Sequence, residues 1–237
     1  MKIFLDAGHN YSGADTGAQG FGLREQDVTW EIAAQTAENL RKLGVQAELS
    51  RHNLTDCLGT DVGSSLAARA AMSDKFGADY CVSIHCNAGG GTGAETYAYK
   101  PGGEGERLAR TVQGRLVSGL GLADRGVKYA NFYMVRKPLA PAILVETAFI
   151  DHAADNKILG AKTSEFAAMI AAGICDYVGI SWENPKEGGI QMVENVSDAV
   201  KKLHEKGIIN SPDYWAQASG FVNHLGELLI NCANKVS

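Results

Sequence analysis

Short apolar runs alternate with longer stretches of helical periodicity from Lys2 to about Ile180. The short runs are rich in β-branched and aromatic residues, which favours strands, and the longer stretches place apolar residues on one helical face. This alternation is typical of an α/β fold, in which helices connect the strands of a sheet. The predicted strands are residues 3–5, 45–50, 80–84, 95–99 and 143–146.

The longest predicted helix covers residues 27–43 and carries Ile32, Ala37 and Leu40 on one face. Gly44 follows its last turn, as is common where a helix ends. The other predicted helices are residues 66–75, 103–120 and 163–178. The predicted fold class is therefore α/β, with a twisted, mostly parallel sheet flanked by helices.

The pattern changes after Ile180. Residues 181–191 contain one proline and two glycines in a polar stretch, which indicates a linker. No strand pattern follows, and helices are predicted at residues 193–206, after the Ser211-Pro212 pair and at residues 222–236. We therefore predict a main domain over residues 1–180, a linker over residues 181–191 and a small all-α module over residues 192–237.

Composition and charge exclude several classes of protein. Apolar residues make up 45% of the chain and charged residues 21%, which is ordinary globular usage and excludes a disordered or rod-like protein. The net charge of −5 provides no broad electrostatic attraction for a polyanion. We therefore expect no nucleic-acid partner.

The cysteines and the apolar stretches bear on the compartment. Five cysteines without a CxxC pair predict free thiols, and neither a disulfide framework nor a Cys-rich zinc site. A run of only three apolar residues, Ile3-Phe4-Leu5, precedes Asp6, against roughly 7–15 in a secretory signal. Residues 166–175 reach about half of the roughly 20 residues that a spanning helix needs. The sequence predicts synthesis in the cytoplasm and no transmembrane segment.

Four polar residues follow predicted strands or open a predicted helix, where ligands bind in open α/β sheets. His9 and His85 follow strands, Glu25 precedes the first long helix, and Glu146 closes the last strand. A strand-end histidine is often structural, and the helix dipole favours a glutamate at a helix start. A carboxylate at the end of an apolar strand demands more explanation, because a buried charge is costly without a partner or a function.

Taken together, these four residues form the ingredients of one site. Two imidazoles and one carboxylate, here His9, His85 and Glu25, are a known ligand set for catalytic zinc with an open position for water. Glu146 would then serve as the general base. No HExxH helix is present, so spacing alone does not establish a metal site.

Five motifs follow one another along the chain: Asp6-Ala7-Gly8-His9, Asp15-Thr16-Gly17-Ala18, Glu25, Ser83-Ile84-His85-Cys86-Asn87-Ala88 and Ile143-Leu144-Val145-Glu146-Thr147-Ala148-Phe149-Ile150. With these motifs, residues 2–180 resemble the zinc-dependent N-acetylmuramoyl-L-alanine amidases of the type-3 amidase family. The resemblance implies one zinc ion held by His9, Glu25 and His85, with Glu146 as the catalytic carboxylate. It implies cleavage of the amide between N-acetylmuramic acid and L-alanine in peptidoglycan. A zinc peptidase that cuts another peptidoglycan bond and a non-catalytic wall-binding module remain alternatives.

Further residues have two interpretations each. Asp6 either orients His9 or caps its loop. Arg51 and Arg69 match arginines of the family and either bind substrate or form structural salt bridges, and Asn87 in the histidine motif is a third candidate for substrate contact. Cys86 is predicted to point away from His85, because successive strand side chains face opposite ways.

The sequence departs from the family pattern after the catalytic glutamate. Ala148 stands where the family usually has glycine, and Asp151-His152 replaces a Ser-Asn pair. The connection at residues 100–104 is short, so we expect no inserted autoinhibitory helix and an open site.

The tail resembles a small helical module that is appended to cell-wall hydrolases of bacteria and their phages. Tyr214 and Trp215 either offer an aromatic surface for wall sugars or fill the core of the module, and oligomerisation is a further possible role. A wall substrate without a secretory signal favours a phage or prophage endolysin that acts after holin-type release or cell lysis. A sporulation or autolytic amidase of the host is the alternative.

Overall fold

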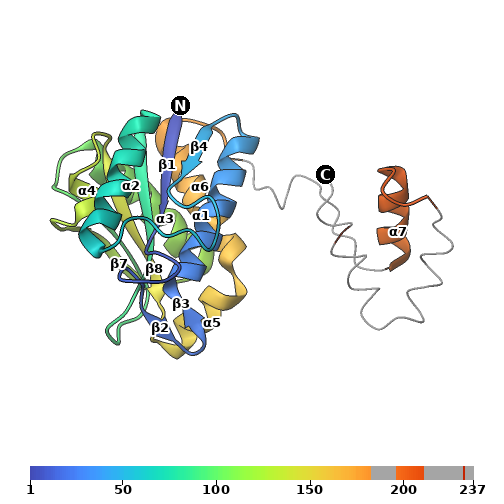
Figure 1. The fold of residues 1–237 in the computed structure, drawn as a ribbon, viewed down its shortest axis with the longest axis horizontal. Helices are drawn as coiled ribbons and strands as arrows, with labels where there is room; N and C mark the ends of the chain where they lie inside the picture. Colours follow the sequence, from blue (N-terminus) through green and yellow to red (C-terminus); the bar gives the residue numbers. More distant parts are fainter. Residues whose placement is uncertain (183–195, 211–231, 233–237) are drawn as a thin grey trace. The chain divides into compact units, whose positions relative to one another are not determined.

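The computed structural model describes residues 1–182, 196–210 and 232 (Figure 1). The chain divides into two compact units, Met1–Trp182 and Glu183–Ser237. The boundary predicted at residue 180 falls two residues from this division. The first unit contains the sheet and every residue of the candidate site, so it is described first.

The first unit is built on a six-stranded sheet with the strand order β4-β1-β5-β8-β6-β7. Neighbouring strands run parallel except β6 and β8, which are antiparallel. A two-stranded antiparallel hairpin, β2–β3, lies apart from this sheet. The strands are β1 (Lys2–Ala7), β2 (Gln19–Gly20), β3 (Leu23–Arg24), β4 (Gln46–Leu49), β5 (Tyr80–Asn87), β6 (Ala94–Ala98), β7 (Asp124–Tyr129) and β8 (Ala142–Phe149).

Six helices accompany the sheet: α1 (Glu25–Lys42), α2 (Val62–Phe76), α3 (Glu104–Leu120), α4 (Tyr133–Arg136), α5 (Ala153–Ala161) and α6 (Thr163–Val178). The α/β fold class is confirmed, and α6 has the predicted bounds. Helix α1 begins two residues before the predicted start, which places Glu25 in its first turn. Residues 99–103 join β6 directly to α3, without an inserted helix, as predicted.

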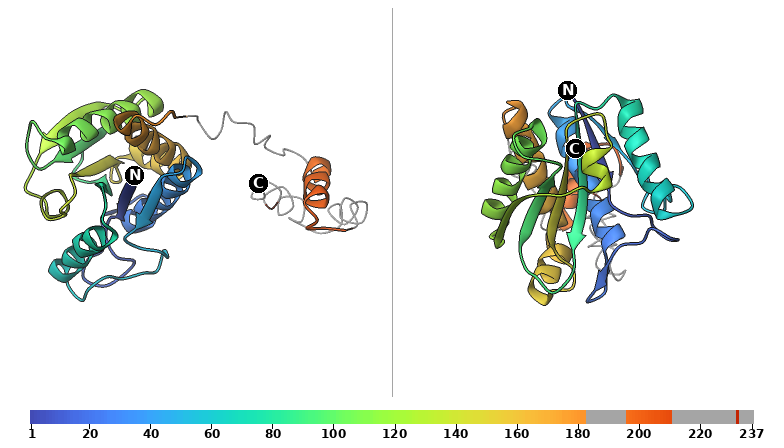
Figure 2. Two further views of the ribbon diagram at one scale, coloured as in Figure 1. Left: turned by 90° about the horizontal axis from the view of Figure 1, so that it is seen from above. Right: turned by 90° about the vertical axis from the view of Figure 1, so that its left-hand side faces the viewer.

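Two apolar cores lie on opposite faces of the sheet, because strand side chains alternate between faces. Ile3, Leu5, Val82, Ile84 and Val145 pack with α1, α3 and α6 in the larger core. On the other face, Phe4, Cys81 and Ala142 pack with α2 and α4, which form a smaller helical layer. The right-hand view of Figure 2 shows helices on both sides of the sheet. Strand residues that share the second face with Phe4 include His85 and Glu146, so the candidate site lies on the face with the smaller helical layer.

The sequence pattern missed β7, the β2–β3 hairpin and the helices α4 and α5. Strand β7, Asp-Arg-Gly-Val-Lys-Tyr, lies at the sheet edge and is largely exposed or half-buried, so it lacks an apolar run. The strands β2 and β3 have two residues each, and α4 has four. Elements this short carry too few residues for a detectable period.

In the second unit, helix α7 (Val196–Glu205) falls within the helix predicted at residues 193–206. Ala199, Val200 and Leu203 are buried along one side of it. The other two predicted helices of the tail lie outside the described residues. Over the described parts of the chain, no single helix has the length and apolarity needed to cross a membrane; α5 and α6 meet that criterion only as a pair bent by 83°.

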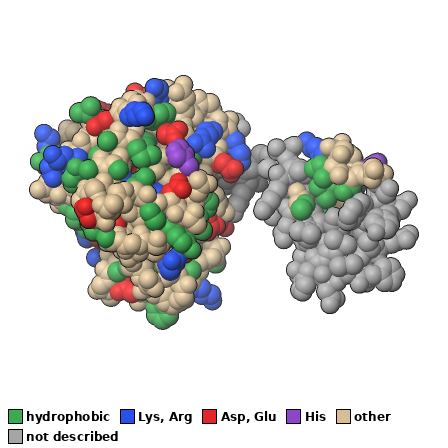
Figure 3. Space-filling model, viewed as in Figure 1, with side chains coloured by type: hydrophobic (Ala, Val, Ile, Leu, Met, Phe, Trp, Pro, Cys, Tyr) green, Lys and Arg blue, Asp and Glu red, His purple; other side chains and the backbone are tan. Residues whose placement is uncertain are grey.

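Charged side chains do not form a field of one sign on the face drawn in Figure 3, where acidic and basic groups are interspersed. This distribution agrees with the small net charge of −5.

Candidate metal centre and active site

His9, Glu25 and His85 meet at the carboxyl ends of β1 and β5. These strands are parallel neighbours, so the loop after β1 carries His9 next to His85 on β5. The two imidazole rings meet edge-on with their centroids 4.8 Å apart. Glu25 enters from the first turn of α1, and its Oε1 lies 3.2 Å from His9 Nε2 and 3.0 Å from His85 Nδ1. One ligand atom from each residue lies within 4.8 Å of the others.

Backbone groups hold Glu25 in this position. Its Oε1 accepts a hydrogen bond from the backbone N–H of Cys86 at 3.0 Å, and its Oε2 accepts one from Ala18 N at 2.8 Å. The β2–β3 hairpin brings Ala18 back to α1, where Glu25 N donates to Ala18 O. These hydrogen bonds hold the buried carboxylate beside the two imidazoles.

Two motif glycines allow the close approach of these side chains. A Cβ on Gly8 would lie 2.5 Å from His85 Cε1, and a Cβ on Gly17 would lie 2.6 Å from Glu25 Oε2 and 2.8 Å from His9 Cδ2. These separations are below van der Waals contact, so any larger residue would displace the side chains of His9, Glu25 and His85. Gly8 and Gly17 are therefore required because a side chain at either position would clash with residues of the site.

The charges of the site compensate one another strongly. Burial alone would raise the pKa of Glu25, but hydrogen bonds with His85 and His9 hold that pKa well below its usual value. Burial opposes protonation of His9, yet its contacts with Asp15 and Glu25 raise the pKa of His9 to about 9. The carboxylates of Glu25 and Asp15 therefore stabilise a positive charge at this position, as a site for a divalent cation requires.

The donor set fits a metal ion of the zinc type. Imidazole nitrogen and carboxylate oxygen are ordinary ligands of catalytic zinc, and three protein ligands leave a position for water. Cys86 lies next to His85 but packs in the core on the opposite face of the sheet, and burial raises the pKa of its thiol. A fourth ligand from Cys86 is thereby excluded, as the strand alternation predicts.

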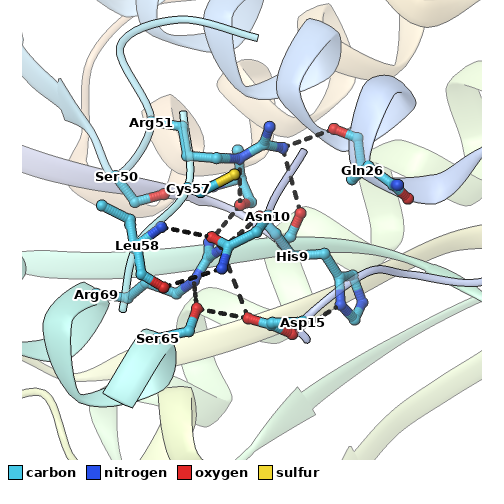
Figure 4. Close-up of polar contacts among 12 residues, drawn as sticks. His9, Asn10, Asp15, Gln26, Ser50, Arg51, Cys57, Leu58, Ser65 and Arg69 are labelled. Atoms are coloured by element: carbon cyan, nitrogen blue, oxygen red, sulfur yellow. Dashed lines mark hydrogen bonds and ion pairs between the residues drawn. The ribbon is translucent and has the colours of Figure 1, made fainter. Parts of the chain in front are cut away.

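Asp15 orients His9 (Figure 4). His9 Nδ1 lies 3.2 Å from Asp15 Oδ1, and an ionised carboxylate only accepts hydrogen bonds, so Nδ1 carries a proton in both the neutral and the charged ring. Nε2 is therefore the nitrogen that can give up its proton to bind a cation. Burial acts to raise the pKa of Asp15, but contacts with His9 and Ser65 keep the pKa below its usual value. Ser65 Oγ donates to Asp15 Oδ2 at 2.5 Å. This arrangement is the carboxylate–histidine pair that fixes ring tautomer at many metal sites.

Asp6 takes neither of its predicted roles. It accepts hydrogen bonds from Arg69 Nη1 at 2.8 Å and from Ser83 Oγ at 2.7 Å. Asp6 is fully buried, and its partners lie on α2 and β5. Asp6 therefore anchors Arg69, and the carboxylate that orients His9 is Asp15.

Arg51 and Arg69 are buried and hold the loop that carries His9. Arg51 donates to backbone oxygens of Ala7, Gly8, Gln26 and Leu54, and Arg69 donates to backbone oxygens of Ala7 and His9. Their exposed fractions are 0% and 1%. The expectation that these arginines bind substrate is corrected by this placement, because their guanidinium groups are enclosed and used within the protein. Arg69 also holds His9 at its left-handed φ of 66°, an uncommon backbone conformation for a residue other than glycine.

Glu146 lies beside His85 on the neighbouring strand β8, in direct register. Its Oε2 is buried and has no hydrogen-bond partner among the described residues. Burial raises the pKa of Glu146 to about 7. A buried carboxylate that holds a proton near neutral pH is suited to acid–base chemistry.

A pocket joins these groups to solvent. Its lining includes His9, Glu25, His85, Asn87, Phe132 and Glu146. Asn87 lines this pocket, and its Nδ2 donates a hydrogen bond to Glu95 Oε1 at 2.8 Å. Contact between Asn87 and substrate stays a prediction.

The segment after Glu146, where the sequence departs from the family, is tied to the loop that follows the pocket residue Ala88. Asp151 Oδ2 accepts hydrogen bonds from Gly89 N at 2.7 Å and Gly90 N at 3.0 Å. The glycine-rich loop between β5 and β6 is therefore held at this carboxylate.

Sequence reasoning missed Asp15, Glu95 and Phe132. Asp15 lies inside one of the five motifs, but the motif alone does not show which carboxylate reaches His9. Glu95 and Phe132 lie outside the motifs that pointed to the site. The register of Glu95 with Glu146 is the signal that places Glu95 there, and it requires the sheet topology.

We expect Asp15→Asn to weaken metal binding by about 10- to 100-fold, because the neutral amide holds the His9 tautomer less firmly. Competition with a metal chelator measures this affinity without reference to activity. Asp79→Asn is the matched control, since Asp79 is exposed and accepts a hydrogen bond from Lys2 N at the other end of β1. Equal affinities in the two variants would remove the orienting role of Asp15.

A helix-flanked sheet with a His–Glu–His donor set beside a buried glutamate is the arrangement of a metal-dependent hydrolase. The chain belongs to the Amidase_3 family, N-acetylmuramoyl-L-alanine amidase, whose family model matches residues 3–176. Members of this family are typically metal-dependent.

Individual proteins agree with the family assignment. The chain is 39% identical over 177 residues to the sporulation-specific N-acetylmuramoyl-L-alanine amidase of Bacillus subtilis (strain 168), covering 73% of this chain and 65% of that protein. It is 31% identical over 179 residues to the endolysin of Bacillus phage SPP1, covering 72% of this chain and 62% of that protein. The chain therefore spans about two thirds of the length of these curated relatives. The crystal structure of N-acetylmuramoyl-L-alanine amidase from Clostridium difficile 630 matches with a TM-score of 0.68 and 31% identity, covering 75% of this chain and 96% of that one.

Proposed function

We propose that this protein hydrolyses the amide bond between N-acetylmuramic acid and the L-alanine of the peptidoglycan stem peptide. The observation that carries the proposal is the buried Oε2 of Glu146, which lies in the same pocket as His9, Glu25 and His85 and has no hydrogen-bond partner in the part of the chain that the structure describes. Membership of the amidase family supports the choice of bond. Peptidoglycan is the proposed substrate.

One zinc ion is the proposed cofactor, and His9, Glu25 and His85 are the residues that would hold it. When bound, zinc supplies Lewis-acid chemistry, lowering the pKa of a water to about 7 and polarising the carbonyl. The same donors accept other divalent ions, so metal analysis of the purified protein tests this choice.

Glu146 moves the proton in the proposed reaction. Its Oε2 takes a proton from the attacking water and returns it to the nitrogen of the leaving alanine as the amide bond breaks. Burial favours the protonated form of Glu146, which makes this return possible near neutral pH. Asp15 keeps the His9 ring oriented, and Phe132 and Leu144 form apolar parts of the pocket wall that limit water around the carboxylate.

Digestion of purified peptidoglycan, followed by mass spectrometry of the new amino termini, tests the function. We expect new N-terminal L-alanine on intact stem peptides, and none after treatment with a chelator. A zinc peptidase acting on another bond would release D-alanine or cut cross-bridges. Absence of N-terminal L-alanine in the presence of zinc would overturn the proposal.

Lytic degradation of the cell wall is the biological role that we propose, as a phage or prophage endolysin. The similarity to the endolysin of Bacillus phage SPP1 supports this role, and the higher identity to a sporulation-specific amidase supports a host role instead. A holin gene beside the coding sequence would favour the endolysin, whereas sporulation genes there would favour the host enzyme.

For the tail, we propose that residues 192–237 bind the cell wall. The appended position of this segment, after the matched residues 3–176, supports a role separate from catalysis. Sedimentation with purified walls should retain the full chain more than a chain that ends at Trp182. Equal retention would reject wall binding, and higher activity of the short chain on soluble fragments would indicate inhibition by the tail.

A further inference from the structure

A row of polar residues crosses the open face of the sheet from the candidate metal centre to the edge strand. His85 on β5 is in register with Glu146 on β8, and Glu146 is in register with Glu95 on β6. The edge strand β7 lies next to β6, and Lys128 on β7 is in register with Tyr97 on β6. Residues paired across strands share a face, so these side chains all lie on the side of the pocket.

Glu95 is the centre of a hydrogen-bonded cluster in this row. Its Oε1 accepts hydrogen bonds from Asn87 Nδ2 at 2.8 Å and Tyr97 Oη at 2.7 Å. Its Oε2 accepts from Arg125 Nε at 2.6 Å and Lys128 Nζ at 2.5 Å. Burial alone would raise the pKa of Glu95, but these donors lower the pKa to about 2. Glu95 is therefore a fixed anion that holds two cations beside the pocket.

Arg125 and Lys128 carry two positive charges, and the Glu95 carboxylate that binds them carries one negative charge. One carboxylate faces one guanidinium and one ammonium, so the cluster keeps a net positive charge. The side chains of Arg125 and Lys128 are 35% and 38% exposed, whereas that of Glu95 is 4% exposed. Arg125 binds Glu95 through Nε and lies over the Phe149 ring at 4.8 Å, and neither of its terminal Nη groups has a hydrogen-bond partner in the described part of the chain. These two groups present N–H donors to solvent in the geometry that binds a carboxylate.

The cluster and the pocket share a wall. Asn87, which lines the pocket, is bonded to Glu95, and Tyr97 packs on the pocket residue Phe132 with ring centroids 4.9 Å apart. Neighbouring strands lie about 4.8 Å apart, so β7 is about 10 Å from Glu146. An extended peptide advances about 3.3 Å per residue, and a side chain adds to its reach. A carboxylate within the first three residues of a bound peptide can therefore meet the cations while its first amide lies at Glu146.

We infer that Arg125 and Lys128 form a subsite for a carboxylate of the stem peptide, on the amine side of the cleaved bond, and that this subsite selects anionic stem peptides. The inference rests on the proposed function and adds the chemical class of the preferred substrate. Glu95 acts as a positioning residue that holds both cations toward the peptide. The cations lie outside the set His9, Glu25, His85 and Glu146, so their loss changes substrate preference and spares metal binding.

A matched pair of soluble substrates tests the inference. Both are N-acetylmuramoyl-L-alanyl peptides, one with a free carboxylate on the residue after L-alanine and one with that carboxylate as a primary amide. A hydrogen-bonded ion pair contributes enough for the wild-type protein to favour the acid by about tenfold or more in kcat/KM. Arg125→Gln with Lys128→Gln should reduce the ratio of acid to amide to about one.

Two further variants serve as a charge reversal and as a matched control. Lys128→Glu places a negative charge in the subsite and should reverse the preference, so that the amide becomes the better substrate. Lys100→Met removes an exposed cation at the far end of β6 and should keep the wild-type ratio. Metal content and thermal unfolding, measured for every variant, report whether each protein is folded.

The outcomes separate this inference from the proposed function. Release of L-alanyl peptides from both substrates at equal rates by the wild-type protein, or a preference that survives in the double variant, would overturn the subsite while the amidase function stands. Release from neither substrate by zinc-loaded protein would overturn the proposed function and the subsite with it.

Discussion

Replacing Glu146 by glutamine is expected to lower kcat by about two to four orders of magnitude, the usual contribution of a general acid–base group. Glutamine has the same shape but neither takes nor returns a proton, so the attacking water and the leaving nitrogen both lose their proton partner. Metal content should remain that of the unchanged protein, because Glu146 stands outside the His–Glu–His donor set. Assays on soluble muropeptides, with metal analysis of the same sample, check both parts.

The same variant has a distinctive effect on stability in metal-free protein. Burial raises the pKa of Glu146 from 4.5 to about 7, so the folded state binds this proton more tightly than the unfolded state does. Stability from this group is complete below about pH 4.5 and is lost as the pH rises through about 7. Glu146→Gln removes that loss, and its Tm relative to wild type should increase between pH 5 and pH 8.

Glu38→Gln is the control for this pair of measurements, since Glu38 is exposed on α1. It should keep both the turnover and the pH dependence of Tm. Near-normal turnover in Glu146→Gln would remove the proton-transfer role from Glu146, and a Tm difference that does not change with pH would contradict the burial of a neutral carboxyl.

Removal of the metal is the second change with a large expected effect. Dialysis against a chelator should abolish amide hydrolysis, and added zinc should restore it. Metal that binds the folded chain more tightly than the unfolded chain stabilises it, so the Tm should fall on removal. His85→Ala should lose bound metal and activity together, because only one nitrogen and one oxygen ligand remain.

His52→Ala is the matched control, since the side chain of His52 is 61% exposed and contacts Glu48 on the protein surface. This variant should keep wild-type metal content, activity and Tm. Full activity in protein from which metal analysis finds no bound ion would contradict a metal-dependent mechanism.

The sequence predicted the long elements of the fold better than the short ones. Helix α6 has its predicted bounds because sixteen residues carry several turns of the apolar pattern. Strand β7 escaped prediction because it is an edge strand with half-buried and exposed residues, which leave no alternating pattern. That omission concealed Arg125 and Lys128, since the position of β7 beside β6 is what places them next to Glu95.

For the site, the predicted metal ligands were easier to find than the residues that orient them. His9, Glu25, His85 and Glu146 were predicted from strand ends and from a family resemblance, and the structure brings all four to one pocket. Buried arginines were harder to assign, because the sequence does not report which carbonyl oxygens a guanidinium meets. Arg51 and Arg69 therefore carried a substrate prediction that their burial corrects.

The sequence by itself determined the α/β class, the motif residues and the chemistry that they can perform, because hydrophobic periodicity and residue type are local properties of the chain. Tertiary structure decided which carboxylate serves which partner. Asp6 and Glu95 lie near strand ends and Asp15 lies in the loop after β1, yet Asp6 pairs with Arg69, Asp15 orients His9, and Glu95 holds two cations. These pairings depend on strand order and register, which bring together residues up to 63 positions apart, and no local pattern encodes such contacts.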